Sequence, residues 1–284
     1  MIAMRELIAW RQEAPWTRDS LVEQDLLLTR AMGAIFADPL LGAQVAMRGG
    51  TVLHKVHLAP AAKYSEDIDL VLVGDRPVSH VRRALQRVLR PLFGAPQLNV
   101  LDTVQLAVRN LMLPSKILRQ EYGFRPTIPP PPNARITIEV NYSETVPCFP
   151  LLSVRYAPTS AAGVPAVTLR TYDLDEALGT KLRALRQRTQ GRDLFDLWHA
   201  WTRSTAGDLG RRVDPERVAT ALAFYLRQEG LTPHRGDFER DLDHKLRAGA
   251  FRDDVDVMLQ SGGGWNAETA AGVVRTVFLS CLPA

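Results

Sequence analysis

The stretch Met47–Val73, MRGGTVLHKVHLAPAAKYSEDIDLVLV, decides the fold of this chain of 284 residues. Its last part, Ile68–Val73, is apolar and β-branched, which predicts a buried strand. Val45–Arg48 predicts a shorter strand, and the Gly-Gly-Thr sequence after it predicts a turn into a short helix, Thr51–His57. A strand, a turn into a helix and a second strand are therefore expected at the centre of an α/β sheet.

Two acidic residues, Asp67 and Asp69, lie where the second of these strands begins. Because side chains alternate along a strand, both carboxylates are expected on one face while Ile68 points into the core. Neighbouring carboxylates repel each other unless a cation lies between them. Hard oxygen ligands of this kind suit Mg²⁺ or Mn²⁺ bound together with substrate phosphates. The pair therefore predicts a divalent metal site.

Gly49, Gly50 and Thr51 predict a phosphate-binding turn. Paired glycines let the backbone approach a ligand closely, and the free N–H groups at the start of a helix attract an anion. Arg48, directly before the glycines, would neutralise negative charge. A phosphate-binding turn followed closely by a metal-binding strand is the layout of a nucleotidyltransferase.

The alternating stretch Arg135–Tyr142 predicts another strand, with its isoleucines and valine toward the core. Thr137, Glu139 and Asn141 would then share the opposite face. Glu139 is the candidate for a third metal-site carboxylate. Two alternatives stay open: a solvated glutamate on an edge strand, and Asn141 as the nearer contributor.

These segments resemble the motifs of the AbiEii family of nucleotidyltransferase toxins, which includes the mycobacterial MenT-type toxins and belongs to the DNA polymerase β superfamily. Gly49-Gly50-Thr51 and Tyr64–Leu70 carry the resemblance to the first motif, and Glu139 matches the second. The resemblance covers most of the chain, although only its motif segments are specific.

A helix expected over Leu174–Gln187, after Asp173, resembles the third motif of the family. Lys181 would reach the phosphates of the nucleotide as a point charge, with Arg188 on the same face. The structural alternative is a helix whose acidic start and basic end suit its dipole.

The segment Gly191–Trp198 resembles the fourth motif, Arg-Asp-Leu-x-Asp-Leu. Asp193 and Asp196 would lie one turn apart on one helical face, with Arg192 before them. A capped helix start with a local Arg–Asp pair is the generic alternative, and the order of all four motifs favours the family reading.

The resemblance implies an α/β (α+β) fold. A nucleotidyltransferase domain (1–160), with a mixed sheet flanked by helices, would be followed by a helical domain (165–284) that completes the active-site cleft. It also implies Mg²⁺- or Mn²⁺-dependent transfer of a nucleoside monophosphate from an NTP to the 3′ end of tRNA, and a cognate antitoxin. The expected catalytic residues are Asp67, Asp69, Glu139, Lys181 and Asp193, of which the first three hold the metal. The expected nucleotide-binding residues are Arg48, Gly49, Gly50, Thr51, Ser65, Lys181, Arg188, Arg192 and Asp196.

Two other functions fit the same residues. One keeps the chemistry but transfers the nucleotide to a protein hydroxyl or a small molecule, and the other is a non-catalytic nucleotide- or RNA-binding regulator. Ser65, two residues before Asp67, is read as a turn residue near the phosphates. A phosphate or nucleotide placed on Ser65 would add negative charge beside the carboxylates and block binding of the metal–triphosphate.

Composition narrows the class of protein. A hydrophobic content of 46% and a charged content of 23% are ordinary for a folded soluble protein, and no apolar run is long enough to cross a membrane. The N-terminus has no features of an export signal, and Cys148 and Cys281 are far apart, so a reducing cytoplasm is expected. The net charge of +4 favours a polyanionic partner only weakly.

Three further expectations concern secondary structure. Ser20 is expected to cap a helix over Val22–Phe36. Separate strands are expected over Gln97–Leu101 and Thr103–Leu113. A helix is expected over Val78–Leu92, with its arginines read as a solvated face rather than an RNA-binding patch.

Overall fold

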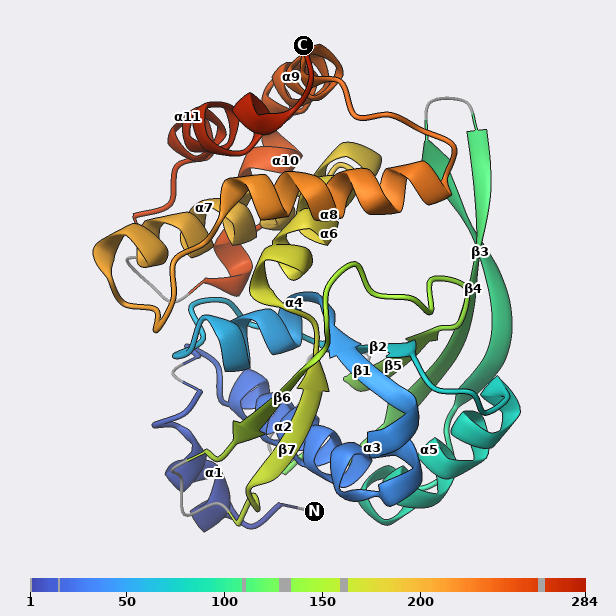
Figure 1. Cartoon of the computed structure of the whole chain (residues 1–284). Helices are drawn as coiled ribbons and strands as arrows, with labels where there is room; N and C mark the ends of the chain where they lie inside the picture. The colour runs from blue at the N-terminus through green and yellow to red at the C-terminus, as the bar shows by residue number, and fades with distance from the viewer. Residues whose placement is uncertain (1, 15, 109–110, 128–133, 159–162, 260–263) are drawn as a thin grey trace. The chain divides into compact units, whose positions relative to one another are not determined.

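The structure, a computed structural model, describes residues 2–14, 16–108, 111–127, 134–158, 163–259 and 264–284 (Figure 1). The chain divides into two compact units. Unit 1 comprises Met1–Gln105, Pro114–Pro147 and Leu151–Tyr172. Unit 2 comprises Leu106–Leu113, Cys148–Pro150 and Asp173–Ala284. The last segment of unit 1 ends at Tyr172, and the predicted domains 1–160 and 165–284 stay a prediction.

A seven-stranded sheet with the order β3-β4-β5-β2-β1-β7-β6 forms the centre of the α/β part. β2 pairs in parallel with β5, and β1 with β7, whereas β1–β2, β4–β5 and β6–β7 are antiparallel. The predicted mixed sheet is therefore confirmed. The strands are β1 (Val45–Arg48), β2 (Asp67–Leu72), β3 (Leu98–Val108), β4 (Leu111–Gly123), β5 (Arg135–Asn141), β6 (Leu152–Tyr156) and β7 (Val167–Thr171).

Helices of unit 1 flank this sheet (Figure 1). α2 contacts β2, β5 and β7, and α5 packs against α2 and α3. Leu26, Leu28 and Ile35 of α2 are fully buried, and because residues 26 and 28 lie on opposite sides of the helix, α2 is buried nearly all round. The helices are α1 (Met4–Trp10), α2 (Asp19–Ala37), α3 (Pro39–Gln44), α4 (Gly49–Val52), the π-helix η1 (Leu53–His57) and α5 (Val78–Phe93).

Two of the local predictions were wrong. α2 begins at Asp19 after Arg18, so Ser20 lies inside the helix and does not cap it. Glu23, expected to complete the capping box, is buried and accepts the backbone N–H of Thr127 at 2.7 Å. The expected break near Asp102 is also absent, because β3 is an edge strand on which an exposed Asp102 is tolerated.

A buried carboxylate, Asp25, fixes the helix that follows the Gly-Gly-Thr turn. Asp25 accepts the indole N–H groups of Trp10 and Trp16 at 2.8 and 3.1 Å. Lys55 of η1 donates to both of its oxygens at 2.7 and 2.8 Å. Because three side chains make four hydrogen bonds to one buried acid, η1 is tied to α2 and to the N-terminal segment.

Unit 2 is helical. α6 contacts both α7 and α8, and α6 has the bounds predicted from the sequence, with Asp173 as its N-cap. Among the residues described, no helix combines the length and hydrophobicity that a membrane crossing requires. The helices are α6 (Leu174–Gln187), α7 (Gly191–Ala206), α8 (Pro215–Gln228), α9 (Arg235–Leu246), α10 (Gly249–Asp253), η2 (Asp256–Met258), α11 (Ala267–Val277) and η3 (Leu279–Cys281).

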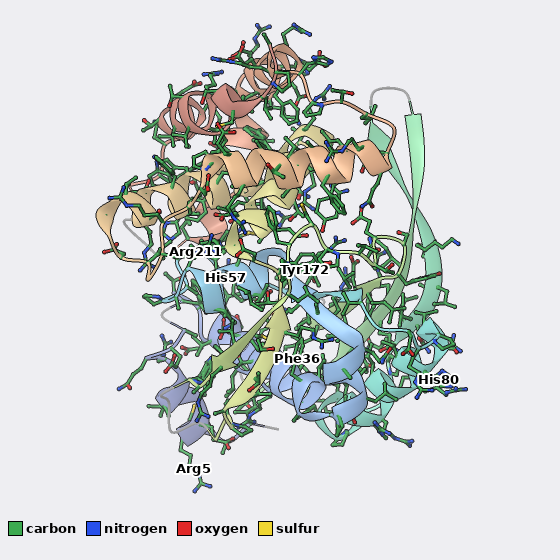
Figure 2. The ribbon with its side chains drawn as sticks, viewed as in Figure 1. Arg5, Phe36, His57, His80, Tyr172 and Arg211 are labelled. Carbon is green, nitrogen blue, oxygen red and sulfur yellow. The ribbon has the colours of Figure 1, made fainter. Side chains whose placement is uncertain are left out.

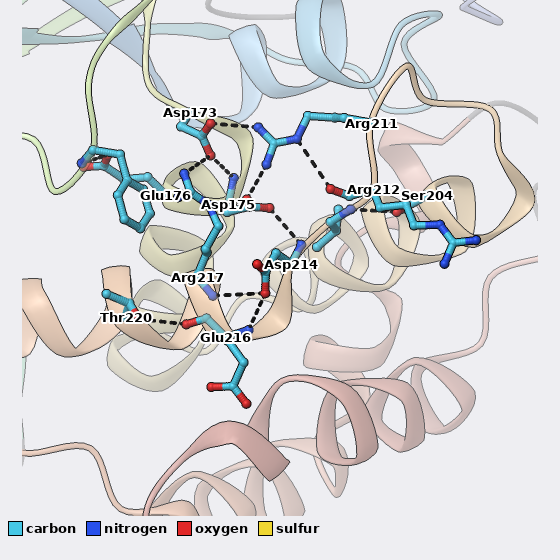
Figure 3. A network of polar contacts seen from close by, with 12 residues as sticks. Asp173, Asp175, Glu176, Ser204, Arg211, Arg212, Asp214, Glu216, Arg217 and Thr220 are labelled. Carbon is cyan, nitrogen blue, oxygen red and sulfur yellow. Dashed lines mark hydrogen bonds and ion pairs between the residues drawn. The ribbon is translucent and has the colours of Figure 1, made fainter.

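A network of ion pairs joins the start of α6 to the start of α8 (Figure 3). Arg211 and Arg217 both pair with the carboxylates of Asp173 and Asp175. Asp175 also accepts the backbone N–H of Asp214, the residue that caps α8, at 3.1 Å. Acids that seemed to serve only the helix dipole therefore make specific tertiary contacts.

The next residue, Glu176, explains why a short segment between β5 and β6 belongs to unit 2. Its fully buried carboxylate accepts the backbone N–H groups of Cys148 and Phe149 at 2.7 and 2.8 Å, and the hydroxyl of Tyr225 at 2.6 Å. Arg217 lies over the ring of Phe149, 3.9 Å from its centre. These contacts hold the segment against α6 and α8.

Candidate active site

The turn after β1 depends on the absence of a side chain at Gly49. Gly49 has φ +82°, a conformation that glycine adopts without penalty. A Cβ atom built on it would lie 1.9 Å from Oδ2 of Asp69 and 2.7 Å from Cγ. The carboxylate of Asp69 therefore lies directly against the backbone of the predicted phosphate-binding turn.

Replacing Gly49 with alanine is expected to lower activity about a hundredfold or more, because Asp69 must move away from its place beside the turn. Gly94→Ala is the matched control, since Gly94 also has φ +82° but has nothing within 4 Å of an added Cβ. Both variants place a Cβ atom at positive φ, which strains the backbone of an L residue. Thermal unfolding should show a loss of stability in both variants, whereas a transfer assay should show a loss of activity only for Gly49→Ala. Equal activities would contradict the close-approach argument.

Thr51 fastens the turn to the acidic strand. Its buried hydroxyl donates to the backbone carbonyl of Asp67 at 2.5 Å. Gly49, Gly50 and Thr51 all lie in α4, which therefore begins two residues earlier than predicted. The backbone N–H groups of this first turn, rather than the threonine hydroxyl, are the groups available for an anion.

Asp67, Asp69 and Glu139 lie on neighbouring parallel strands. In the pairing of β2 with β5, Asp67 lies opposite Thr137 and Asp69 lies opposite Glu139. Adjacent strands are about 4.8 Å apart, so side chains at these positions on one face are neighbours. The alternation predicted for both strands is confirmed, since Ile68, Ile136 and Ile138 are fully buried.

The environment of Asp67 disfavours its negative charge. Burial of the carboxylate, and then the charges of Asp69, Glu66 and Glu139, raise the pKa of Asp67 to about 7, against a hydrogen bond from Thr137 that lowers it. The residue is nevertheless exposed at the start of β2, so solvent screens part of this repulsion. A divalent cation would relieve the remainder.

Glu139 is engaged elsewhere in this structure. Its Oε1 accepts the Nε–H of Arg119 at 2.7 Å. In the part of the chain described, no three His, Cys, Asp or Glu side chains are arranged to hold a metal ion. The structure thus brings Asp67 and Asp69 together, with Glu139 beside them but paired with Arg119. The acids present fit a hard cation, because their mutual repulsion and oxygen donors are what Mg²⁺ offsets and binds.

Asn141, the alternative third contributor, has another role. Its Oδ1 accepts the backbone N–H groups of Ser143 and Glu144, both at 2.9 Å, and the Ser143 hydroxyl at 3.2 Å. An amide oxygen with three donors already in place shapes the turn after β5. Ser65 lies half-buried in the loop before β2.

Arg48 is held beside the turn by a residue that the sequence did not single out. Its Nη1 donates to Oε2 of Glu144 at 2.7 Å, and both side chains are largely buried. Although burial opposes the charge, Glu144, the nearby Tyr172 and Asp69 raise the pKa of Arg48 above its usual range. Figure 2 marks Tyr172, the fully buried last residue of unit 1.

The family-motif residues of unit 2 form a second cluster. Nζ of Lys181 lies 3.2 Å from Oδ1 of Asp193 and 2.7 Å from Oδ2 of Asp196, and both aspartates are fully buried. Arg188 donates to both oxygens of Asp193, at 2.7 and 2.8 Å. Burial opposes the charge of Lys181, but Asp196 and Asp193 more than offset this and raise its pKa. Lys181 is therefore a buried partner of two acids.

Asp193 keeps its negative charge despite its burial. Burial favours the neutral acid, but Lys181 and Arg188 together lower the pKa of Asp193 below its ordinary value. Arg192 of the same motif donates its backbone N–H to Asp254 at 3.1 Å and its Nε–H to Gln190 at 3.2 Å. The expected cleft between the two domains, in which these groups would meet the metal site, stays a prediction.

The sequence matches the model of a protein family described as "Nucleotidyl transferase AbiEii toxin, Type IV TA system" over residues 30–271. This match includes the Gly-Gly-Thr turn, the acidic strand and the Lys181 cluster. The chain belongs to the AbiEii family. It is thus a nucleotidyltransferase toxin of a type IV toxin–antitoxin system, and the predicted resemblance is confirmed.

The fold agrees with this family. The structure is similar to that of MenT4, a nucleotidyltransferase toxin from Mycobacterium tuberculosis H37Rv, with a TM-score of 0.60 at 17% identity. The similarity covers 99% of this chain and 91% of MenT4. None of the curated proteins matches the sequence. At 17% identity, this similarity shows only that the two chains share a fold, and it does not extend the activity of MenT4 to this AbiEii chain.

Sequence reasoning missed Glu144 and Arg119, which form ion pairs with Arg48 and Glu139 of this AbiEii protein. Glu144 follows the predicted strand in a polar turn, and Arg119 lies on β4, beyond the strand that was predicted to end at Leu113. Strand register links Arg119 to Glu139, because the two residues lie directly opposite each other in the β4–β5 pairing. This register is known only from the structure, so the sequence could not have predicted the pair.

Proposed function

We propose that this AbiEii toxin transfers a nucleoside monophosphate from an NTP to the 3′ acceptor end of tRNA, in a Mg²⁺-dependent reaction that blocks translation and growth. The observation that supports it best is the contact of Asp69 with Gly49. An acid that binds a cation then lies against backbone N–H groups that bind a phosphate. Metal and triphosphate would meet at this point.

In this proposal each residue of unit 1 has a separate task. The backbone of Gly49, Gly50 and Thr51 binds the triphosphate, and Arg48 offsets its charge. Asp67 and Asp69 would hold Mg²⁺, with Glu139 as a third carboxylate beside them. Bound Mg²⁺ supplies charge neutralisation at the α-phosphate and the leaving group.

The reaction is a substitution at the α-phosphorus. The acceptor hydroxyl oxygen forms the new P–O bond, the bond to the β-phosphate bridge breaks, and pyrophosphate leaves. The hydroxyl proton passes to an acid of the site, for which Glu139 is the candidate. In this proposal, unit 1 orients the attacking oxygen of the acceptor hydroxyl and the leaving oxygen of pyrophosphate, and it receives the proton.

The cluster of unit 2 is proposed to contribute to nucleotide binding through its arginines. Arg188, with 47% of its side chain exposed, can meet a phosphate while it stays paired with Asp193. Lys181, paired with Asp193 and Asp196, would hold Arg188 and Asp193 in place from the buried side. Arg192 would add a further cation. Family membership also implies a cognate antitoxin.

The test is a labelling assay with the purified protein, Mg²⁺, total tRNA and each α-labelled NTP in turn. A labelled tRNA that requires Asp67 is the expected result, so Asp67→Ala should give none. Asp75→Asn, which removes an exposed acid in the loop after β2, is the matched control and should label as wild type does. Label on protein alone would retain the chemistry and overturn the tRNA acceptor. No label from folded protein would favour the non-catalytic regulator.

A further inference from the structure

Arg48 and Asp69 are placed to form an ion pair with each other. They lie directly opposite in the antiparallel pairing of β1 with β2, so their side chains share one face of the sheet. In keeping with this register, the charge of Asp69 contributes to the raised pKa of Arg48. An arginine that paired fully with Asp69 would occupy a carboxylate needed for a cation.

In the structure, Glu144 accepts the guanidinium instead. The contact of Arg48 Nη1 with Glu144 Oε2 is 2.7 Å, with side-chain exposures of 18% and 14%. A charged hydrogen bond shielded from water in this way is strong and directional. It draws the guanidinium toward the turn after β5.

The turn that carries Glu144 is built to hold this position. Asn141, the last residue of β5, accepts the backbone N–H of Glu144 at 2.9 Å and lies with its amide nitrogen 3.5 Å from Oε2. Its own backbone is fixed in the sheet opposite Val71 and Ile117. Glu144 is therefore presented to Arg48 from a rigid element.

We infer that Glu144 is a positioning residue that keeps Arg48 away from Asp69, so that Asp69 stays available for a divalent cation. This inference rests on the proposed function, since it concerns the metal site of that reaction. Glu144 itself contacts neither substrate nor metal. It acts only through Arg48, which remains poised beside the Gly-Gly-Thr turn.

The experiment measures Mn²⁺ binding to the full chain, without nucleotide, by calorimetry or by the electron paramagnetic resonance of free Mn²⁺. Glu144→Ala and Glu144→Gln are expected to weaken binding about 10–100-fold, because Arg48 then pairs with Asp69. The double variant Arg48→Gln/Glu144→Ala should bind nearly as wild type does, because no guanidinium remains to compete. Glu144→Gln keeps the length of the side chain and an oxygen that can accept the amide N–H of Asn141, so it separates loss of charge from loss of the side chain.

The double variant decides between positioning and mere structural support. If Glu144 only stabilised the turn, Arg48→Gln/Glu144→Ala would bind Mn²⁺ as weakly as Glu144→Ala, and the inference would be overturned. Wild-type affinity in both Glu144 variants would also overturn it, while leaving the proposed function intact. Asp69→Asn tests the site itself: if wild type and Asp69→Asn bind Mn²⁺ equally, both proposals fall.

Discussion

Replacing Asp67 with asparagine is expected to abolish nucleotidyl transfer and at the same time stabilise the metal-free protein above neutral pH. Asparagine keeps the shape of the side chain but removes the charge that holds a cation. Metal ligation accounts for several kcal/mol of transition-state stabilisation, so the rate should fall about a thousandfold or more. The stability effect has the opposite sign, because the lost charge is one that its neighbours repel.

The pH dependence follows from the raised pKa of Asp67. The carboxyl group has an ordinary pKa of 3.8 and a folded-state pKa of about 7, so between these values the folded state holds a proton that the unfolded state has released. Ionisation of Asp67 therefore lowers the stability of the metal-free protein as the pH rises from about 4 to about 7, and the full loss of stability persists above pH 7. In EDTA, the melting temperature of Asp67→Asn should exceed that of wild type at pH 8, and the difference should shrink toward pH 4.

Mg²⁺ provides the complementary measurement. At pH 8 it should raise the melting temperature of wild type, because binding to the folded state alone is stabilising, and should have less effect on Asp67→Asn. Asp75→Asn should follow wild type in every condition. A lower melting temperature for Asp67→Asn at pH 8 would show that the neighbouring acids do not repel Asp67 as the structure indicates.

The parts of the fold that the sequence predicted are those in which local pattern and tertiary environment agree. β1 and α6 have the predicted bounds, because a short apolar run in one and an Asp173 cap in the other match their surroundings. β2 begins and ends one residue earlier than predicted, and β5 ends one residue earlier. The acidic face of β2 and the Gly-Gly-Thr turn beside it could also be predicted, because paired glycines and alternating acids are patterns within one short segment.

What could not be predicted depends on contacts between distant segments. Glu23 and Ser20 form a capping-box pattern, but a hydrogen bond to Thr127 uses the glutamate instead. The position of Glu144 over Arg48 requires the register of β5 against β2 and the turn that Asn141 shapes. No periodicity within one segment carries this information.

Replacing Lys181 is the second change for which a large effect is expected, and this effect is on the stability of the fold. Lys181→Met should lower the free energy of unfolding by about 3–5 kcal/mol, because it removes the cation shared by two fully buried carboxylates. Urea unfolding of the full chain measures this loss. Arg240→Gln in the same unit, where 75% of the side chain is exposed, should change stability by less than about 0.5 kcal/mol.

A double variant tests the cause of that loss. Lys181→Met/Asp196→Asn removes the lysine together with the nearer of its two acids, while Asp193 keeps both hydrogen bonds from Arg188. Most of the lost stability should therefore return, since a neutral group has replaced an uncompensated buried charge. If Lys181 instead served only to bind phosphates, Lys181→Met would unfold as wild type does and would raise the KM for the NTP. That result would assign the lysine to the nucleotide and not to the interior of unit 2.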